Sequence, residues 1–139
     1  MANEYKDLDD VKAALKKVFN KCSKNRNNID SVGLIYNRGV VLTSDQKIDQ
    51  RIAATLANNF FQTAKNSFGD SSNLKDITCM IEEEGKLIAW TVVHVVDNTA
   101  LIFSGDLEDD EMNLNLHRSC ISGYKDELIE LAKKFIEFT

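Results

Sequence analysis

The sequence predicts an α/β (α+β) protein with a five-stranded antiparallel sheet between two helical layers, a three-layer α/β/α sandwich. Tight turns join neighbouring predicted strands, the central strands are apolar on both faces, and three long segments repeat apolar residues at helical spacing. The predicted order of elements is α-β-β-α-β-β-β-α. Because both faces of the sheet need cover, we expect the middle helix on one face and the first and last helices on the other.

The first part of the chain is predicted to form a helix and a β-hairpin. Apolar residues recur at three- and four-residue steps over Asp7–Lys24, which indicates a helix. Strands are predicted at Val32–Tyr36 and Val40–Thr43. A short turn joins them, and we expect Gly39 to supply its positive φ.

The longest helical segment, Asp45–Phe68, carries two apolar stripes. We expect Ser44 or Asp45 to cap this helix and Gly69 to end it. One stripe consists of Ile48, Ile52, Leu56 and Phe60, and the other of Ala53, Ala57, Phe61, Ala64 and Phe68. Together they span about 220° of the helix, whereas one contact with a core needs little more than about 100°. The sequence therefore predicts that the alanine-rich stripe packs against a partner.

The rest of the chain is predicted to contain three strands and a helical region. Leu74–Glu82 alternates apolar and polar residues, whereas Lys86–Val96 and Thr99–Ser104 are apolar on both sides. An acidic loop, Gly105–Glu111, precedes a C-terminal stretch with apolar residues at heptad-like steps. Within that stretch, Gly123 is a candidate position for a bend or a break in the helix.

Length and composition favour one domain over residues 1–139 and exclude several classes of function. The net charge of −5 argues against binding to nucleic acid or to anionic membranes. No apolar run approaches the about 20 residues that cross a bilayer, and the polar start is unlike a signal peptide. Three widely spaced cysteines indicate reduced thiols and a cytoplasmic protein.

Four segments resemble the roadblock family of dynein light chains and GTPase-associated proteins, whose fold is profilin-like. They are the hairpin Ser31–Asp45, the alanine-rich helix Ile48–Ala64, and the strands Gly85–Val93 and Thr99–Gly105. The resemblance covers nearly all of the chain and rests on patterns of hydrophobic residues, with no single diagnostic residue. The C-terminal helical region departs from it, because it is longer than the usual ending of the family.

The resemblance implies a non-enzymatic protein that works as a dimer. Roadblock domains pair their third strands edge to edge and their middle helices side by side, and the combined surface binds small Ras-like GTPases or motor and signalling subunits. We therefore expect a homodimer, or a heterodimer with a related chain, that binds a small GTPase without a cofactor. The interface expected on this chain comprises Ala53, Ala57, Phe61, Ala64, Phe68, Ile77, Thr78, Cys79, Met80 and Ile81.

Residues that could carry chemistry are few. The six glycines are scattered and form no phosphate-binding loop, so the chain is not predicted to be a GTPase itself. His117 and Cys120 stand three apart, but two ligands do not make a zinc site, and we interpret them as a helix surface with a half-buried thiol. His94 and Cys79 could form a dyad on neighbouring strands. We interpret His94 instead as a core or interface histidine.

Other residues have a structural and a functional interpretation. Trp90 is predicted to lie in the core, although a ligand platform is the alternative. The acidic stretch Glu108–Glu111 either faces water or meets a basic partner, and Arg38 and Arg51 are candidate partner contacts. Two alternative functions remain, a monomeric binding domain of the longin or profilin kind and a small enzyme or ligand sensor that uses His94 and Cys79.

Overall fold

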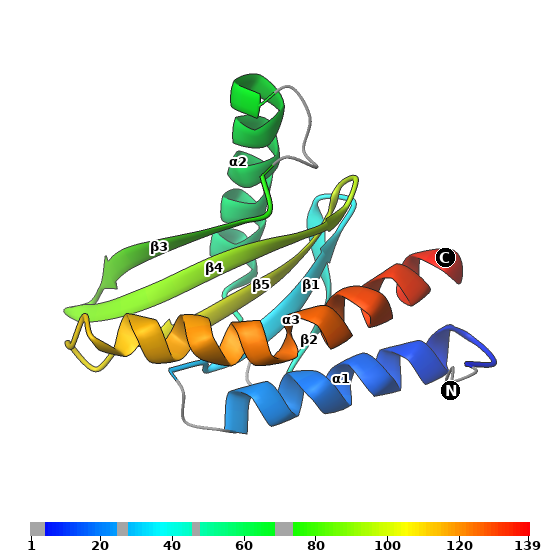
Figure 1. Ribbon diagram of the computed structural model, residues 1–139, viewed down its shortest axis with the longest axis horizontal. Coiled ribbons are helices and arrows are strands. Elements are labelled where there is room, and N and C mark those ends of the chain that lie inside the picture. Colours follow the sequence, from blue (N-terminus) through cyan, green and yellow to red (C-terminus); the bar gives the residue numbers. More distant parts are fainter. Residues whose placement is uncertain (1–4, 25–27, 46–47, 69–73) are drawn as a thin grey trace.

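The computed structural model describes residues 5–24, 28–45, 48–68 and 74–139. It confirms the predicted order of elements (Figure 1). The elements are α1 (Leu8–Lys24), β1 (Ser31–Tyr36), β2 (Gly39–Thr43), α2 (Gln50–Phe68), β3 (Asp76–Glu83), β4 (Lys86–Val96), β5 (Thr99–Asp106) and α3 (Asn113–Glu137).

All five strands form one antiparallel sheet with the order β2-β1-β5-β4-β3. The first hairpin lies at one end of the sheet, and β5 pairs with both β1 and β4 in the middle. β3 and β2 are therefore the two edge strands. The long connection through α2 carries the chain from one edge to the other.

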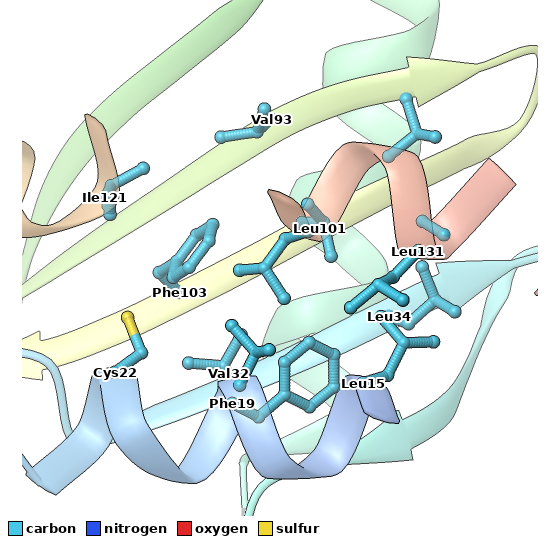
Figure 2. Packing of buried hydrophobic residues seen from close by; sticks show 14 of the residues in the cluster. Leu15, Phe19, Cys22, Val32, Leu34, Val93, Leu101, Phe103, Ile121 and Leu131 are labelled. Atoms are coloured by element: carbon cyan, nitrogen blue, oxygen red, sulfur yellow. The ribbon is translucent and has the colours of Figure 1, made fainter. Parts of the chain in front are cut away.

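Helices cover both faces of the sheet, as predicted. α1 and α3 lie side by side on one face and α2 lies on the other (Figure 1). Figure 2 shows the core on the α1 and α3 face, where Phe19 and Leu131 meet sheet residues such as Leu101. On the opposite face, α2 packs over Trp90 and Ile102.

The apolar character of β4 on both faces follows from its central place. Trp90 and Val92 belong to the core beneath α2, whereas Val93 and Val95 belong to the core beneath α1 and α3. Side chains alternate across a strand, so a strand between two helical layers must be apolar at consecutive positions.

The turn of the first hairpin differs from the prediction. Positive φ occurs at Asn37 (51°) and Arg38 (75°), whereas Gly39 is the first residue of β2 and pairs with Tyr36. Two-residue hairpin loops of type I′ need positive φ at both central residues, and asparagine tolerates it well. The prediction that Gly39 supplies the positive φ is therefore wrong, because the two residues before it supply it.

The middle helix begins later than predicted. α2 starts at Gln50 and not at Asp45. The side chain of Asp49 caps it, because its Oδ1 accepts a hydrogen bond of 3.1 Å from the backbone N–H of Ile52. Ser44 continues the sheet instead, since its Oγ accepts a hydrogen bond from a backbone N–H of β1.

The C-terminal helix runs without interruption through Gly123, from Asn113 to Glu137. No heavy atom outside the local helix lies within 4 Å of the place that a Cβ at Gly123 would take, so this glycine sits on an open surface. The end of the middle helix that we expected at Gly69 lies outside the described residues.

Candidate functional site

The edge strand β3 is the most exposed apolar part of the sheet. Ile77 and Met80 keep 43% and 44% of their surface exposed, although β4 pairs with the whole inner side of the strand. Within the described residues, no strand pairs with its outer side. A long apolar edge strand with unpaired backbone groups is a template for pairing with another chain.

Side chains of β3 alternate between the two faces of the sheet. Cys79 and Ile81 pack against the core beneath α2, and alternation places Ile77 on that face as well. Thr78 points to the other face, where it contacts Arg118 of α3. The strand residues of the expected interface thus lie together on one free edge.

The alanine-rich stripe of α2 faces the sheet of its own chain. Ala53, Ala57 and Ala64 are fully buried, so their side chains have no surface left for a second copy. This corrects the expectation that they meet a partner. Ala53 and Ala57 instead belong to the core cluster that α2 forms with its own sheet. Phe61 is partly exposed. Phe68 ends α2, but its side chain lies outside the described residues.

Phe61 marks the flank of α2 that points toward β3. Its ring makes an edge contact with the ring of His94, at 6.2 Å between centroids. The backbone N–H of His94 in turn donates to the carbonyl of Lys75, the residue before β3. A partly exposed aromatic ring therefore lies near the segment that leads into the edge strand. The opposite flank of α2 carries Ile52 and Leu56, which are also partly exposed.

A line of hydrogen bonds crosses the sheet from β3 to α3. Nη1 of Arg118 donates to Oγ1 of Thr78, and Oγ1 of Thr78 lies 2.8 Å from that of Thr91. Oγ1 of Thr91 lies 2.8 Å from Nε2 of His117, and Nδ1 of His117 donates to the carbonyl of Asn28 over 2.8 Å. We call these five residues the His117 chain.

His117 is fully buried, which corrects the interpretation of a surface histidine. The carbonyl of Asn28 only accepts hydrogen bonds, so Nδ1 carries the proton and Nε2 accepts from Thr91. Burial lowers the pKa of His117, and the nearby Arg118 lowers it further. Hydrogen bonding to Asn28 and the charge of Asp30 act in the opposite direction. The ring is therefore held in its neutral form.

Neither of the other chemical pairings forms. Cys79 stands opposite Trp90, and His94 lies four residues further along β4, about 13 Å away at the rise of a strand. The proposed dyad of Cys79 and His94 is therefore wrong. The sulfur of Cys120 contacts Cys22, and the described residues contain no group of three or more side chains that could hold a metal ion.

The remaining candidates lie apart from β3. Trp90 is buried as predicted, and its indole N–H has no hydrogen-bond partner among the described residues. Arg38 occupies the first hairpin turn, and Arg51 is exposed in the first turn of α2. The acidic stretch Glu108–Glu111 is exposed before α3. None of the helices in the described part of the chain is apolar and long enough to span a bilayer.

Sequence reasoning named Thr78 but missed Thr91 and its link to His117. The one available signal was a threonine within the apolar run LIAWTVV. A hydroxyl at a buried strand position needs a hydrogen-bond partner, so a partner for Thr91 was to be expected. Its partner could be identified only once the faces of β4 were assigned.

No family model matches the chain, and no curated protein sequence matches it. Solved structures do match. MglB of Myxococcus xanthus has 18% identity and a TM-score of 0.65, covering 97% of this chain and 96% of that one. A Roadblock/LC7 domain from Streptomyces avermitilis has 15% identity and a TM-score of 0.53, covering 82% and 97%. A structure described as MglB with tetrameric arrangement has 13% identity and a TM-score of 0.57, covering 90% and 92%.

These likenesses define the class of the protein by its fold. The chain has the roadblock fold over nearly its whole length, which confirms the fold that the resemblance implied. Its described architecture is similar to that of MglB from Myxococcus xanthus, including the three helices and the five-stranded sheet.

Proposed function

We propose that this protein is a non-enzymatic dimer that acts as an adaptor or regulator of a small Ras-like GTPase or of a signalling complex. The observation that carries the proposal is the free, apolar edge of β3 in a chain with the roadblock fold. The MglB structure described as tetrameric supports self-association of this fold. A small GTPase is the partner class implied by the resemblance to the roadblock family.

Charge and apolar contacts favour one register for the paired edges. If two copies of β3 pair antiparallel around Cys79, Ile77 of each copy faces Ile81 of the other. Lys75 then faces Glu83, which is a favourable pair across the strands. Shifting the register by one residue toward the C-terminal end of the partner strand would place Ile77 opposite Glu82.

The same register brings Asp76 opposite Glu82 of the second copy, which is the one unfavourable pair. Arg118 offsets it, because its Nη2 lies 3.1 Å from Oδ1 of Asp76. The flank of α2 that carries Phe61 lies near the start of this edge, so the second copy would cover part of it as well. Strand pairing and helix contact together would form a closed two-fold interface.

Solution mass tests the dimer. Light scattering at micromolar concentration should give twice the 15.7 kDa of one chain. Ile77→Asp should give the monomer, because it places a charge at an apolar contact. Val41→Asp is the matched control, since Val41 is 41% exposed on the other edge strand, β2. A monomeric wild type, or equal effects of the two variants, contradicts the proposed interface and favours a monomeric binding domain.

Crosslinking tests the register. Two Cys79 residues that face each other across the two-fold axis should be joined by a short bismaleimide into a covalent dimer. Cys22 and Cys120 are buried and should not react, and Cys79→Ser should abolish the product. A covalent dimer that forms equally well with Cys79→Ser would exclude the register.

The partner is tested by binding to purified small GTPases in their GDP and GTP forms. We expect one of them to bind the wild type in a manner that depends on the nucleotide. The Ile77→Asp variant should bind more weakly, because a composite surface needs both copies. Failure of every GTPase of the source cell to bind would leave a dimeric scaffold and overturn the regulatory part of the proposal.

A further inference from the structure

We propose that His117, acting through Thr91 and Thr78, positions the free edge of β3 and so controls its pairing with a second copy. The inference rests on the proposed dimer. It starts from the His117 chain, which joins the segment before β1 to α3, β4 and β3 in one line of hydrogen bonds. The residue at its outer end, Thr78, belongs to the edge strand itself.

Every hydrogen in the His117 chain has a defined place. Arg118 can only donate, so Thr78 accepts from it and gives its own hydrogen to Thr91. Thr91 then donates to Nε2 of His117, and Nδ1 donates to Asn28. Thr78, Thr91 and His117 each accept from one neighbour and donate to the next. A change of protonation at the imidazole therefore alters the hydrogen bonds of the edge strand.

The inner end of the His117 chain, at Asn28, is fixed. The side-chain amide of Asn28 donates to the carbonyl of Asp106 over 2.9 Å. A Cβ added to Gly105 would lie 1.6 Å from the carbonyl oxygen of Asn28, which shows how closely the two backbones approach. Because Asn28 is held on β5 in this way, the movable end of the His117 chain is the one at β3.

A second proton on His117 is incompatible with this order. Nε2 would become a donor directed at Thr91, whose own hydrogen already lies between the two atoms. The Thr91 hydroxyl must turn away, and the bonds to Thr78 are then lost or reversed. Among the described residues, the charges near the ring are Arg118 and Asp30. Asp76 is bound to Arg118, and Lys125 lines a small pocket together with Asp76, Arg118 and Thr91.

Hydrogen exchange of the Ile77→Asp variant tests the positioning role in a single chain. Adding Thr91→Val, which keeps the shape and removes the hydroxyl, should speed exchange of the β3 amides by about tenfold. Thr78→Ser keeps a hydroxyl at the same place and should leave their exchange unchanged. The amides shared by β1 and β5 serve as an internal control for folding. Equal exchange in β3 with and without the Thr91 hydroxyl would overturn the inference.

A pH profile separates positioning from a merely structural role. As the pH falls from about 7.5 toward the lowered pKa of His117, the dissociation constant of the wild-type dimer should rise, by up to about tenfold per pH unit once the ring titrates. His117→Gln keeps an acceptor for Thr91 but does not titrate, so its profile should be flat. Equal slopes for both proteins would exclude control by His117. A wild type that is monomeric at neutral pH would refute the dimer, while the exchange experiment still decides the positioning role.

Discussion

The sulfur atoms of Cys22 and Cys120 lie 3.8 Å apart, although 98 residues separate them in the sequence. Both are free cysteines buried between α1 and α3. Their contact helps to hold these helices together over the sheet, and the sequence spacing alone gave no reason to pair them. Because these two cysteines are buried, Cys79 is the most accessible of the three thiols.

Thiol reactivity should therefore differ sharply among the cysteines. Burial raises the pKa of Cys22, and the adjacent Cys120 raises it further; burial also raises the pKa of Cys79. We expect N-ethylmaleimide to modify only Cys79 in the native Ile77→Asp variant, and all three thiols in denaturant. Intact-protein mass spectrometry counts the adducts. Native modification of Cys22 or Cys120 would contradict the packing of the two helices.

Acid should destabilise the fold through His117. Its pKa is lowered in the folded chain, so the unfolded chain binds the proton first as the pH falls below about 6.5. The free energy of unfolding should therefore decrease by up to about 1.4 kcal/mol per pH unit from this group, between the unfolded and the folded pKa. Urea unfolding of the Ile77→Asp variant at several pH values measures it. The same background with His117→Gln should lose less stability over this range, and an identical loss would contradict the assignment.

Replacing two of the glycines by alanine should change the free energy of unfolding in opposite directions. Gly105→Ala places a Cβ against the backbone of Asn28 and should lower the free energy of unfolding by about 3 kcal/mol. Gly123→Ala lies on the open surface of α3 and should raise it by about 0.5–1 kcal/mol. Thermal melts followed by circular dichroism compare them. A harmless Gly105→Ala would refute the close approach of the two backbones.

The start of α2 can be tested by removing its cap. Asp49→Ala should lower the free energy of unfolding by about 1 kcal/mol, because the N–H of Ile52 loses its acceptor. Asp45→Ala is the control, since Asp45 precedes the helix and, among the described residues, its side chain forms an exposed ion pair of 3.8 Å with Lys16. If Asp45→Ala proved the more damaging, the helix would begin where the sequence pattern first placed it.

The fold could be predicted because its signals are local. Continuous apolar runs identify β4 and β5 as central strands, and the turns between them require an antiparallel sheet. Helix boundaries were less certain, since Ser44, Asp45 and Asp49 are all good capping residues and only the structure selects among them.

The candidate site could be predicted only in part. A stripe of Ala53, Ala57 and Ala64 is visible in the sequence, but its period does not say which surface it meets. Small side chains suit close contact with a partner helix and with the chain's own sheet equally well. Here all three are buried within the chain, with Ala53 and Ala57 in the core beneath α2. The His117 chain depends on which face of β4 carries Thr91, and this follows from tertiary structure.

The two edge strands of the sheet differ in length and regularity, and this difference affects whether further copies of the protein can add to the sheet. β2 is three residues shorter than β3, and its pairing with β1 shifts register between Leu34 and Ile35, which leaves Val41 as an extra residue. Such a bulge twists the strand and interrupts its row of backbone donors and acceptors. The proposed pair joined through β3 would therefore end on both sides in a poor template, so its assembly should stop at a discrete particle instead of extending into a filament.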